Sequence, residues 1–571
     1  MQLARRLQPN NLFDNVRGDL FGGLTAAIVA LPLALAFGVA SGAGATAGLY
    51  GAVFSGFFAA LFGGTPSQVT GPTGPMTVVM ATVITKLIAT NPESGLAMAF
   101  TAVMLSGCFQ ILFGVLRLGQ FITLMPYTVI SGFMSGIGII IVALQIAPLI
   151  GYPAQSSVVV ALQQLPEALA SPNPVATGLG LLTLLIVFGW SGKLGRIVPS
   201  PLVALIVCTG LAVLVFPASN IPRIGEIPQG FPTLQWPQLS LNQLEDIVGY
   251  GLMLSILGAI DSLLTSLVAD NITHTRHDSE QELIGQGIGN LMSGLFGGLP
   301  GAGATMRTVI NVQAGGRSPL SGMFHALVLL SIVLWAGDVT AQIPHAVLAG
   351  ILIKVGIKII DWGFLWRVAQ VSMRAALVTY GVLFLTVFVD LITAVVAGAF
   401  VANMLTIHRL SNIQSEQVRG ITHPDEDPSV ILTPEEQQML RQADDRILLI
   451  QMTGPMSFGA ARTIAHYMSQ NYDALVLDFS RVPLLGVTAS LNIDSAIRAA
   501  QHRHHGKIFI VGAKGQVIER LRRFKLQAVL PRQNFVPNCH QALQSALILL
   551  EADITGLSKL EPPQLSLDSG R

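Results

Sequence analysis

The sequence predicts an α-helical membrane protein with fourteen transmembrane segments, arranged as two inverted repeats of seven, followed by a cytoplasmic α/β domain. Three observations lead to this prediction. Hydrophobic residues make up 51% of the 571 residues and charged residues only 11%, whereas soluble domains average roughly 25% charged residues. The phrase Leu-Phe-Gly-Gly, followed by one residue and a proline, occurs at 61–66 and again at 295–300. After residue 407 the long apolar runs end and shorter strand-like and helix-like runs follow.

The transmembrane segments are apolar runs of the length that crosses a bilayer core, about 17 to 25 residues. They lie at 19–40, 45–63, 73–90, 96–116, 121–149, 174–190 and 199–216, and then at 247–269, 281–298, 304–314, 319–336, 342–359, 375–389 and 391–407. The third and the tenth are the weakest, and each follows one copy of the repeated phrase. We therefore predict that these two segments are half-helices, as in transporters built from inverted repeats.

The distribution of Lys and Arg predicts the orientation. An even number of spans places both termini on one side, and cytoplasmic loops are enriched in basic residues. With both termini in the cytoplasm, most basic residues between the segments lie on the cytoplasmic side, and Lys86 and Arg223 lie outside. The net charge of +1 and the lack of a basic block argue against a nucleic acid partner and leave membrane lipid as the surrounding medium.

The chain divides by composition into four parts. We assign residues 1–410 to the transmembrane domain and the polar, acidic stretch 411–440 to a linker. Residues 441–555 alternate strand-like and helix-like runs, a pattern typical of a small α/β domain. The tail 556–571 is rich in Pro, Ser and Gly and is predicted to be disordered.

Asp261 lies near the middle of the eighth segment, where a charge is costly and usually functional. Thr265 is four residues further on and therefore on the same helix face. Together with freed carbonyl groups around Gly303 and Ala304, these side chains would supply hard oxygen ligands for a small cation. Asp261 could instead carry a proton, or have a structural role by pairing with Arg307 or capping a helix.

The starts of the two half-helices predict an anion site. Helix N-termini carry free N–H groups and a partial positive charge, and Pro75 suits a first helical turn. Thr73 can donate its hydroxyl to an anion, while Ala304 and Thr305 offer backbone N–H groups from the opposite helix. Arg307 could add positive potential there, compensate the intramembrane carboxylate or contact a loop. Close helix packing is the alternative role of the glycines in these stretches.

These residues resemble a known family. The stretches 18–32 and 42–50 are similar to the first two helices of SulP-type anion permeases that carry a C-terminal STAS domain, and the run from Phe57 to Met76 most resembles the sodium-dependent bicarbonate transporters of cyanobacteria. The resemblance implies fourteen segments in a core and a scaffold, a homodimer, and a place in the plasma membrane of a cyanobacterium as part of its carbon concentrating mechanism.

The resemblance also implies the transport chemistry and the residues that perform it. It implies symport of bicarbonate with sodium into the cell by alternating access. The sodium site implied by the family consists of Asp261, Thr265, Gly303, Ala304 and Thr305. Bicarbonate would be held by Thr73 together with Ala304 and Thr305.

The C-terminal domain resembles STAS domains at Asp478–Val482, the strand end that precedes a phosphorylated hydroxyl in bacterial regulators. Thr488 stands at the acceptor position, but the acidic and glycine neighbours of that position are missing. We therefore expect a dimerisation or regulatory platform rather than a phosphorylation switch.

Three rival functions remain open from the sequence. A proton-coupled permease for sulfate or another inorganic anion would share the fold, and a channel-like anion conductor would need no cation gradient. A signalling protein that only senses anions is less consistent with two interrupted helices and an intramembrane carboxylate. The sequence contains no Ser-His-Asp, metal-binding or phosphate-loop motif, so we do not expect an enzyme.

Overall fold

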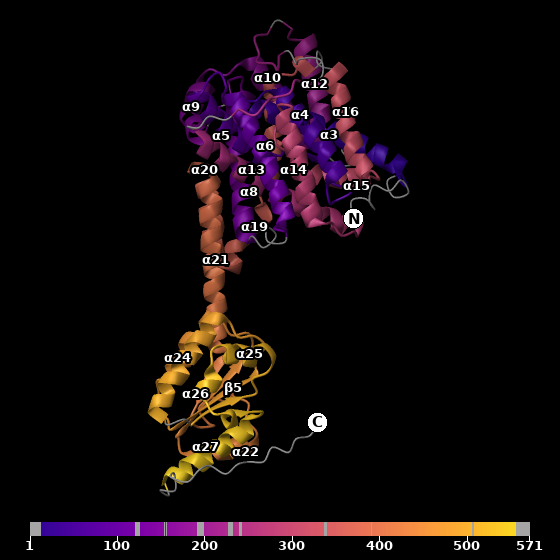
Figure 1. Ribbon diagram of the computed structural model, residues 1–571. Helices are drawn as coiled ribbons and strands as arrows, with labels where there is room; N and C mark the ends of the chain where they lie inside the picture. The colour runs from indigo at the N-terminus through magenta and orange to yellow at the C-terminus, as the bar shows by residue number, and fades with distance from the viewer. Residues whose placement is uncertain are drawn as a thin grey trace. The chain divides into compact units, whose positions relative to one another are not determined.

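The computed structural model divides the chain into two compact units, Met1–Ala402 and Asn403–Arg571 (Figure 1). The residues that it describes are 13–119, 126–153, 155, 157–190, 199–217, 219–225, 232–238, 243–335, 340–389, 391–504 and 507–554. The tail 556–571, predicted to be disordered, lies outside the described residues.

A helix overlaps each of the fourteen segments predicted from the sequence. In the first half these are α3 (Val16–Ala40), α4 (Ala45–Phe62), α5 (Gly74–Thr90), α6 (Gly95–Val115), α8 (Tyr127–Leu149), α10 (Pro174–Gly189) and α12 (Ser200–Leu214). In the second half they are α13 (Leu244–Thr273), α14 (Ser279–Leu295), α15 (Thr305–Gln313), α16 (Pro319–Trp335), α18 (His345–Ile359), α20 (Met373–Phe388) and α21 (Leu391–Glu416). Among the described residues, two further helices, α9 (Val158–Ala170) and α19 (Trp362–Val371), lie between these segments.

The helical membrane class is thus confirmed, whereas the number of spans stays a prediction. Among the described helices, six are long and apolar enough to cross a membrane by themselves, and the bent pair α9 and α10 could make a seventh. Several of the others, such as α12, α16 and α20, are apolar but shorter. Helices of this length reach across only where they lie nearly upright or where the bilayer is thin.

Two short strands replace helix next to the repeated phrases. Strand β1 (Thr70–Gly71) lies between α4 and α5, and β2 (Ala302–Gly303) lies between α14 and α15. They pair antiparallel, with Thr70 opposite Gly303. Helix α15 has nine residues and is too short to span a bilayer. Helix α5 has 17 residues, the lower limit for a span, so α15 fits the half-helix prediction better than α5 does.

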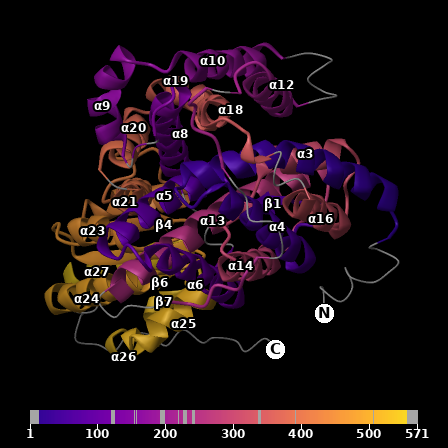
Figure 2. The same ribbon diagram turned by 90° about the horizontal axis from the view of Figure 1, so that it is seen from above.

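The helices of the first unit form two groups by their contacts. The α14 group contains α3, α4, α5, α6, α13, α14, α15 and α16, and the α8 group contains α8, α9, α10, α12, α18, α19 and α20. The groups meet mainly where α3 packs on α12 and α18 and where α5 packs on α8. In Figure 2 the α8 group lies toward the top of the view and α4, α13, α14 and α16 lie below it.

Small residues allow close approach of helices within the α14 group. A Cβ atom on Gly287 of α14 would lie 2.6 Å from the carbonyl oxygen of Gly107 on α6, and a Cβ on Gly107 would lie 2.4 Å from the carbonyl oxygen of Gly287. Because these contacts are to backbone atoms, no side chain can turn away to make room. Glycine at both positions is therefore required for this helix packing.

The second unit contains a five-stranded sheet in the order β3-β4-β5-β6-β7, with β3 antiparallel to β4 and all other pairs parallel. Its strands are β3 (Val418–Ile421), β4 (Ile447–Thr453), β5 (Ala474–Arg481), β6 (Ile508–Val511) and β7 (Phe535–Val536). Its helices are α22 (Pro434–Ala443), α23 (Phe458–Tyr467), α24 (Val487–His504), α25 (Gly515–Arg523), α26 (Leu526–Val529) and α27 (Cys539–Ile554). Both faces of the sheet are apolar and covered, as parallel sheets require.

The alternating strands and helices predicted for 441–555 are present, and β4, β5 and β6 form the parallel part of the sheet. The stretch 411–440, expected to be a linker, differs from that expectation. Helix α21 continues to Glu416, β3 joins the edge of the sheet, and α22 begins at Pro434 with a capping box at Thr433. The boundary between the compact units accordingly falls after Ala402 rather than after residue 410.

Replacing Gly287 by alanine should destabilise the membrane unit. The added methyl group meets backbone of α6, and overpacking of this kind typically costs about 1–3 kcal/mol. We expect a lower Tm for Gly287→Ala in detergent solution. Gly178→Ala on α10 is the matched control, because a Cβ there meets no atom within 4 Å. Equal Tm values for the two variants would contradict this account of the packing.

Candidate functional site

Asp261 lies on α13 beside the start of α5. Its side chain is buried, and its Oδ2 accepts a hydrogen bond of 3.1 Å from the hydroxyl of Thr73. Thr73 is the residue before the first turn of α5, but its hydroxyl does not cap that helix. The hydroxyl is directed to the carboxylate instead. The contact joins an intramembrane charge on one helix to the N-terminus of another.

A second set of oxygen atoms lies one turn further along α13. The hydroxyl of Thr265 donates to the carbonyl oxygen of Gly303 at 2.9 Å and lies 2.7 Å from the hydroxyl of Thr305. The backbone N–H of Gly303 donates to the hydroxyl of Ser262 at 3.0 Å. Strand β2 and the start of α15 are therefore attached to α13. The structure thus brings three of the five residues of the implied cation site, Thr265, Gly303 and Thr305, into direct contact, and Asp261 lies one turn before Thr265 on the same helix.

The fifth residue, Ala304, directly precedes α15, and its N–H donates to the carbonyl oxygen of Val69 at 2.9 Å. Neither α5 nor α15 has a side-chain cap at its N-terminus. The first N–H groups of both helices have no partner within the helix. They give each end a partial positive charge, which suits a bound anion.

Of the three roles considered from the sequence for Arg307, the structure shows the contact with a loop. Arg307 is buried, and its Nη2 donates a hydrogen bond to the carbonyl oxygen of Pro72, in the loop before α5. No ion pair with Asp261 is formed among the described residues. The guanidinium also explains the glycine at 71, because a Cβ there would lie 2.4 Å from Nη1. Arg307 thereby fixes the loop on which Thr73 stands.

A buried carboxylate that the sequence interpretation did not single out holds the first repeated phrase. Oε2 of Glu282, on α14, accepts the backbone N–H groups of Gly64 and Thr65, each at 2.8 Å. Its Oε1 accepts the side-chain amides of Gln68 at 2.7 Å and Gln286 at 2.8 Å. Four donors therefore satisfy a carboxylate that is 1% exposed and has no cationic partner in this part of the structure.

The second repeated phrase is held by the same helix. The side-chain amide of Asn290 accepts a hydrogen bond from the N–H of Gly301 at 2.7 Å and donates one to the carbonyl oxygen of Gly301 at 2.9 Å. Ser293 donates to the carbonyl oxygen of Leu299 at 2.6 Å. One helix, α14, thus positions the chain on the way into β1 and into β2. The signal in the sequence was the unusual row of polar residues on α14, which is otherwise expected to lie in an apolar interior.

Thr488 lies in the second unit and is far in sequence from Asp261 and its neighbours. It is exposed in the first turn of α24, and its carbonyl oxygen accepts a hydrogen bond from Asn492. The described residues contain no cluster of three or more His, Cys, Asp and Glu side chains. The oxygen-rich donor set around Asp261 and Thr265 is instead of the kind that hard monovalent and divalent cations prefer.

The chain combines a helical membrane unit with an α/β unit. In the membrane unit, two interrupted helices lie at an intramembrane carboxylate. This combination defines a multi-pass membrane transporter rather than an enzyme. Residues 16–382 match the sulfate permease family and residues 438–545 match the STAS domain. The chain belongs to the sulfate permease family, which confirms the resemblance seen in the sequence.

Curated relatives carry this likeness over nearly the whole chain. It is 51% identical to the bicarbonate transporter BicA of Synechocystis sp., with 96% of this chain and 97% of the relative covered. It is 52% identical to BicA of Picosynechococcus sp. over the same shares. A putative sulfate transporter of Bacillus subtilis, YvdB, is 30% identical, with 83% and 87% covered.

Solved structures agree with the fold. The transmembrane domain of a cyanobacterial bicarbonate transporter, BicA, is 56% identical and covers 67% of this chain and 98% of its own, with a TM-score of 0.63. The overall structure of SLC26A9 is 17% identical and covers 95% of this chain and 92% of its own, with a TM-score of 0.80. At that identity the second likeness shows the fold alone.

Replacing Glu282 by glutamine should loosen the first repeated phrase. The new amide presents a donor to groups that are themselves donors, so at least one of the four hydrogen bonds is lost. Hydrogen bonds to charged groups contribute about 1.5–3 kcal/mol each, and we expect a clear fall in Tm for Glu282→Gln. Glu167→Gln, at an exposed position of α9, is the control. A Glu282→Gln protein as stable as this control would show that the network is dispensable.

Proposed function

We propose that this protein is a secondary active transporter that carries bicarbonate into the cell together with sodium. The observation that carries the proposal is the contact of Asp261 with Thr73, which places an intramembrane carboxylate beside an uncapped helix N-terminus. A site of this kind holds a cation and an anion next to each other. The likeness to the two BicA proteins supports bicarbonate as the anion.

The cation in this proposal is sodium, held by Asp261, Thr265, Gly303, Ala304 and Thr305. These residues would bind the ion through the oxygen atoms of a carboxylate, of hydroxyl groups and of backbone carbonyl groups, which are hard ligands. Thr265 uses its hydroxyl hydrogen on Gly303 and accepts the hydroxyl of Thr305 with one lone pair, which leaves its second lone pair to face a cation. Interrupted helices that expose carbonyl groups are the usual way in which transporters bind sodium within the membrane.

The anion in this proposal lies between the starts of α5 and α15, where Thr73, Ala304 and Thr305 would hold it. Thr305 would offer its backbone N–H at the start of α15. The hydroxyl of Thr73 and the N–H of Ala304 would turn to the anion from Asp261 and Val69, their partners in this structure. Thr305 is exposed, and Thr73 is half-buried. A small anion can therefore reach donors that are not already used within the helices. Arg307 would contribute positive potential from its place under the Pro72 loop.

Binding both ions together explains how an anion could enter a negative-inside cell. Moving one charge against the membrane potential costs about 2.3 kcal/mol per 100 mV. A co-bound sodium ion cancels this cost and adds its own gradient. In this proposal, alternating access arises because the α14 group, which contains the site, moves against the α8 group. The protein would lie in a cyanobacterial plasma membrane, serving the carbon concentrating mechanism, with both termini in the cytoplasm.

Uptake of radiolabelled bicarbonate into proteoliposomes tests the proposal. We expect an inward sodium gradient to drive uptake by the wild type and Asp261→Asn to abolish the sodium dependence, because the carboxylate charge is lost. Thr265→Val, which keeps the side-chain shape, should raise the sodium concentration for half-maximal uptake about tenfold. Glu245→Gln, at an exposed position in the first turn of α13, serves as control. Proton-driven uptake of sulfate, or bicarbonate uptake that ignores sodium, would refute the proposed symport.

We also propose that the protein forms a homodimer through the STAS domain. An apolar patch of Leu484, Val487 and Leu491 lies at the start of α24, with each side chain at least 50% exposed. Val487 and Leu491 share one helix face. Apolar residues grouped in this way on a soluble domain indicate a protein contact, and a second copy of the chain would bury the patch.

Leu491→Glu should therefore convert the dimer to a monomer, because it would bury a charge at the contact. The mass of the full chain in detergent, measured by light scattering, should fall by half. Ile548→Glu on α27 changes an equally exposed apolar residue outside the patch and should leave the mass unaltered. An unchanged mass for Leu491→Glu would exclude α24 as the dimer contact.

A further inference from the structure

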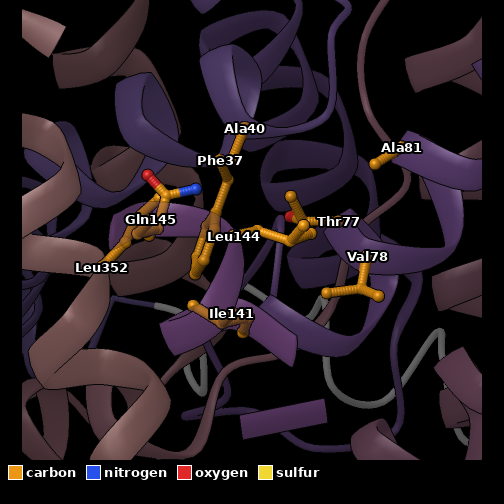
Figure 3. A pocket seen from close by; sticks show the side chains of 9 residues that line it. All are labelled: Phe37, Ala40, Thr77, Val78, Ala81, Ile141, Leu144, Gln145 and Leu352. Atoms are coloured by element: carbon orange, nitrogen blue, oxygen red, sulfur yellow. The ribbon is translucent and has the colours of Figure 1, made fainter. Parts of the chain in front are cut away.

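A small cavity lies at the boundary between the two helix groups. Its lining comes from α3 and α5 on one side and from α8 and α18 on the other (Figure 3). The cavity volume is about 20 Å³, which is room for a single water molecule. Most of its lining is apolar, including Phe37, Val78, Leu144 and Leu352. The only two lining residues with polar side chains are Thr77 and Gln145.

The two polar side chains differ in whether they have partners. The hydroxyl of Thr77 donates to the carbonyl oxygen of Thr73 at 2.8 Å. Gln145 is 6% exposed, and its side chain makes no hydrogen bond to any residue that the structure describes. A buried amide is stable only where a ligand or a water molecule takes up its hydrogen bonds, and the cavity beside Gln145 gives such a partner access to the amide. Figure 3 shows Gln145 among the apolar side chains of the lining.

The position of Gln145 relates it to the anion site. A Cβ on Gly74, the first residue of α5, would lie 2.9 Å from Cδ1 of Ile141 on α8. Ile141 is therefore the α8 side chain that touches the helix start on which Thr73 stands. Gln145 is four residues further along α8 and so on the same face. On the α5 side of the cavity, Thr77 lies one turn after Thr73, just as Gln145 lies one turn after Ile141 on the α8 side. The cavity wall on both sides therefore continues from the start of α5.

The amide of Gln145 has the chemistry of a ligand for a protonated oxyanion. It presents two N–H donors and one carbonyl acceptor, and bicarbonate presents negative oxygens and one O–H. We propose that Gln145 hydrogen-bonds the transported anion from the α8 group and thereby selects bicarbonate over anions that lack a hydroxyl hydrogen. This inference rests on the proposed function. The donors described above all come from the α14 group, so Gln145 would complete the site across the moving boundary.

Nitrate is the probe for this selectivity, because it is planar like bicarbonate but has no O–H. A site that uses a buried polar group on a substrate hydroxyl discriminates strongly against an analogue that lacks it. We expect Gln145→Met, which keeps the length of the side chain, to raise the KM for bicarbonate about tenfold in sodium-driven uptake. Inhibition by nitrate should change much less, so the preference for bicarbonate over nitrate should fall by about the same factor. The sodium concentration for half-maximal uptake should stay as in the wild type.

Two further variants keep the test decisive. Leu144→Met changes the neighbouring lining residue and should leave KM and the nitrate preference unaltered. Gln145→Leu repeats the loss of the amide in case the methionine variant is poorly folded, as judged by size-exclusion chromatography. Wild-type KM and nitrate preference in either Gln145 variant would overturn the inference while leaving sodium-driven bicarbonate uptake intact. Failure of the wild type to take up bicarbonate would instead overturn the proposed function, and this inference with it.

Discussion

The structure of the membrane unit depends on satisfying the backbone where two helices are interrupted. In the interior of a bilayer no water is available to replace a lost helical hydrogen bond, and irregular backbone survives only where protein surrounds it. Strands β1 and β2 solve part of this problem by pairing with each other. Side chains of α14 take up several further groups, with Glu282 holding the first interruption and Asn290 the second, while Ser262 of α13 and Thr308 of α15 hold others.

This arrangement leaves the helix starts themselves free. Because strands and loops are held from α14, the hydroxyl of Thr73 does not have to cap α5 and can face Asp261. The N-termini of α5 and α15 likewise keep unused N–H groups near a negative side chain. The hydrogen bonds from α14 thus leave the two helix starts available for a candidate site within an apolar surrounding. A binding site and its support are here built from different helices.

Much of this could be predicted from the sequence because the dominant signals are local. Long apolar runs located the helices, and the Gly and Pro interruptions together with an intramembrane Asp indicated the candidate site. The supporting residues were harder to find. Glu282 lies near the start of α14, where a carboxylate usually faces water, and nothing local says that it is buried. Gln145 is a single polar residue in an apolar helix. The role of β3 as an edge strand and the continuation of α21 depend on pairing with distant segments.

The pairing of β1 with β2 has a consequence for how the protein is made. Val69 donates to Thr308, and these residues are 239 positions apart. At the usual rate of 5–20 residues per second, roughly 10 to 50 s pass between the synthesis of the two segments. During this time the first half of the chain lies in the membrane with an interrupted helix whose backbone has no partner. The contacts between the two interruptions, and with them the candidate ion site, can form only after the second half has been made.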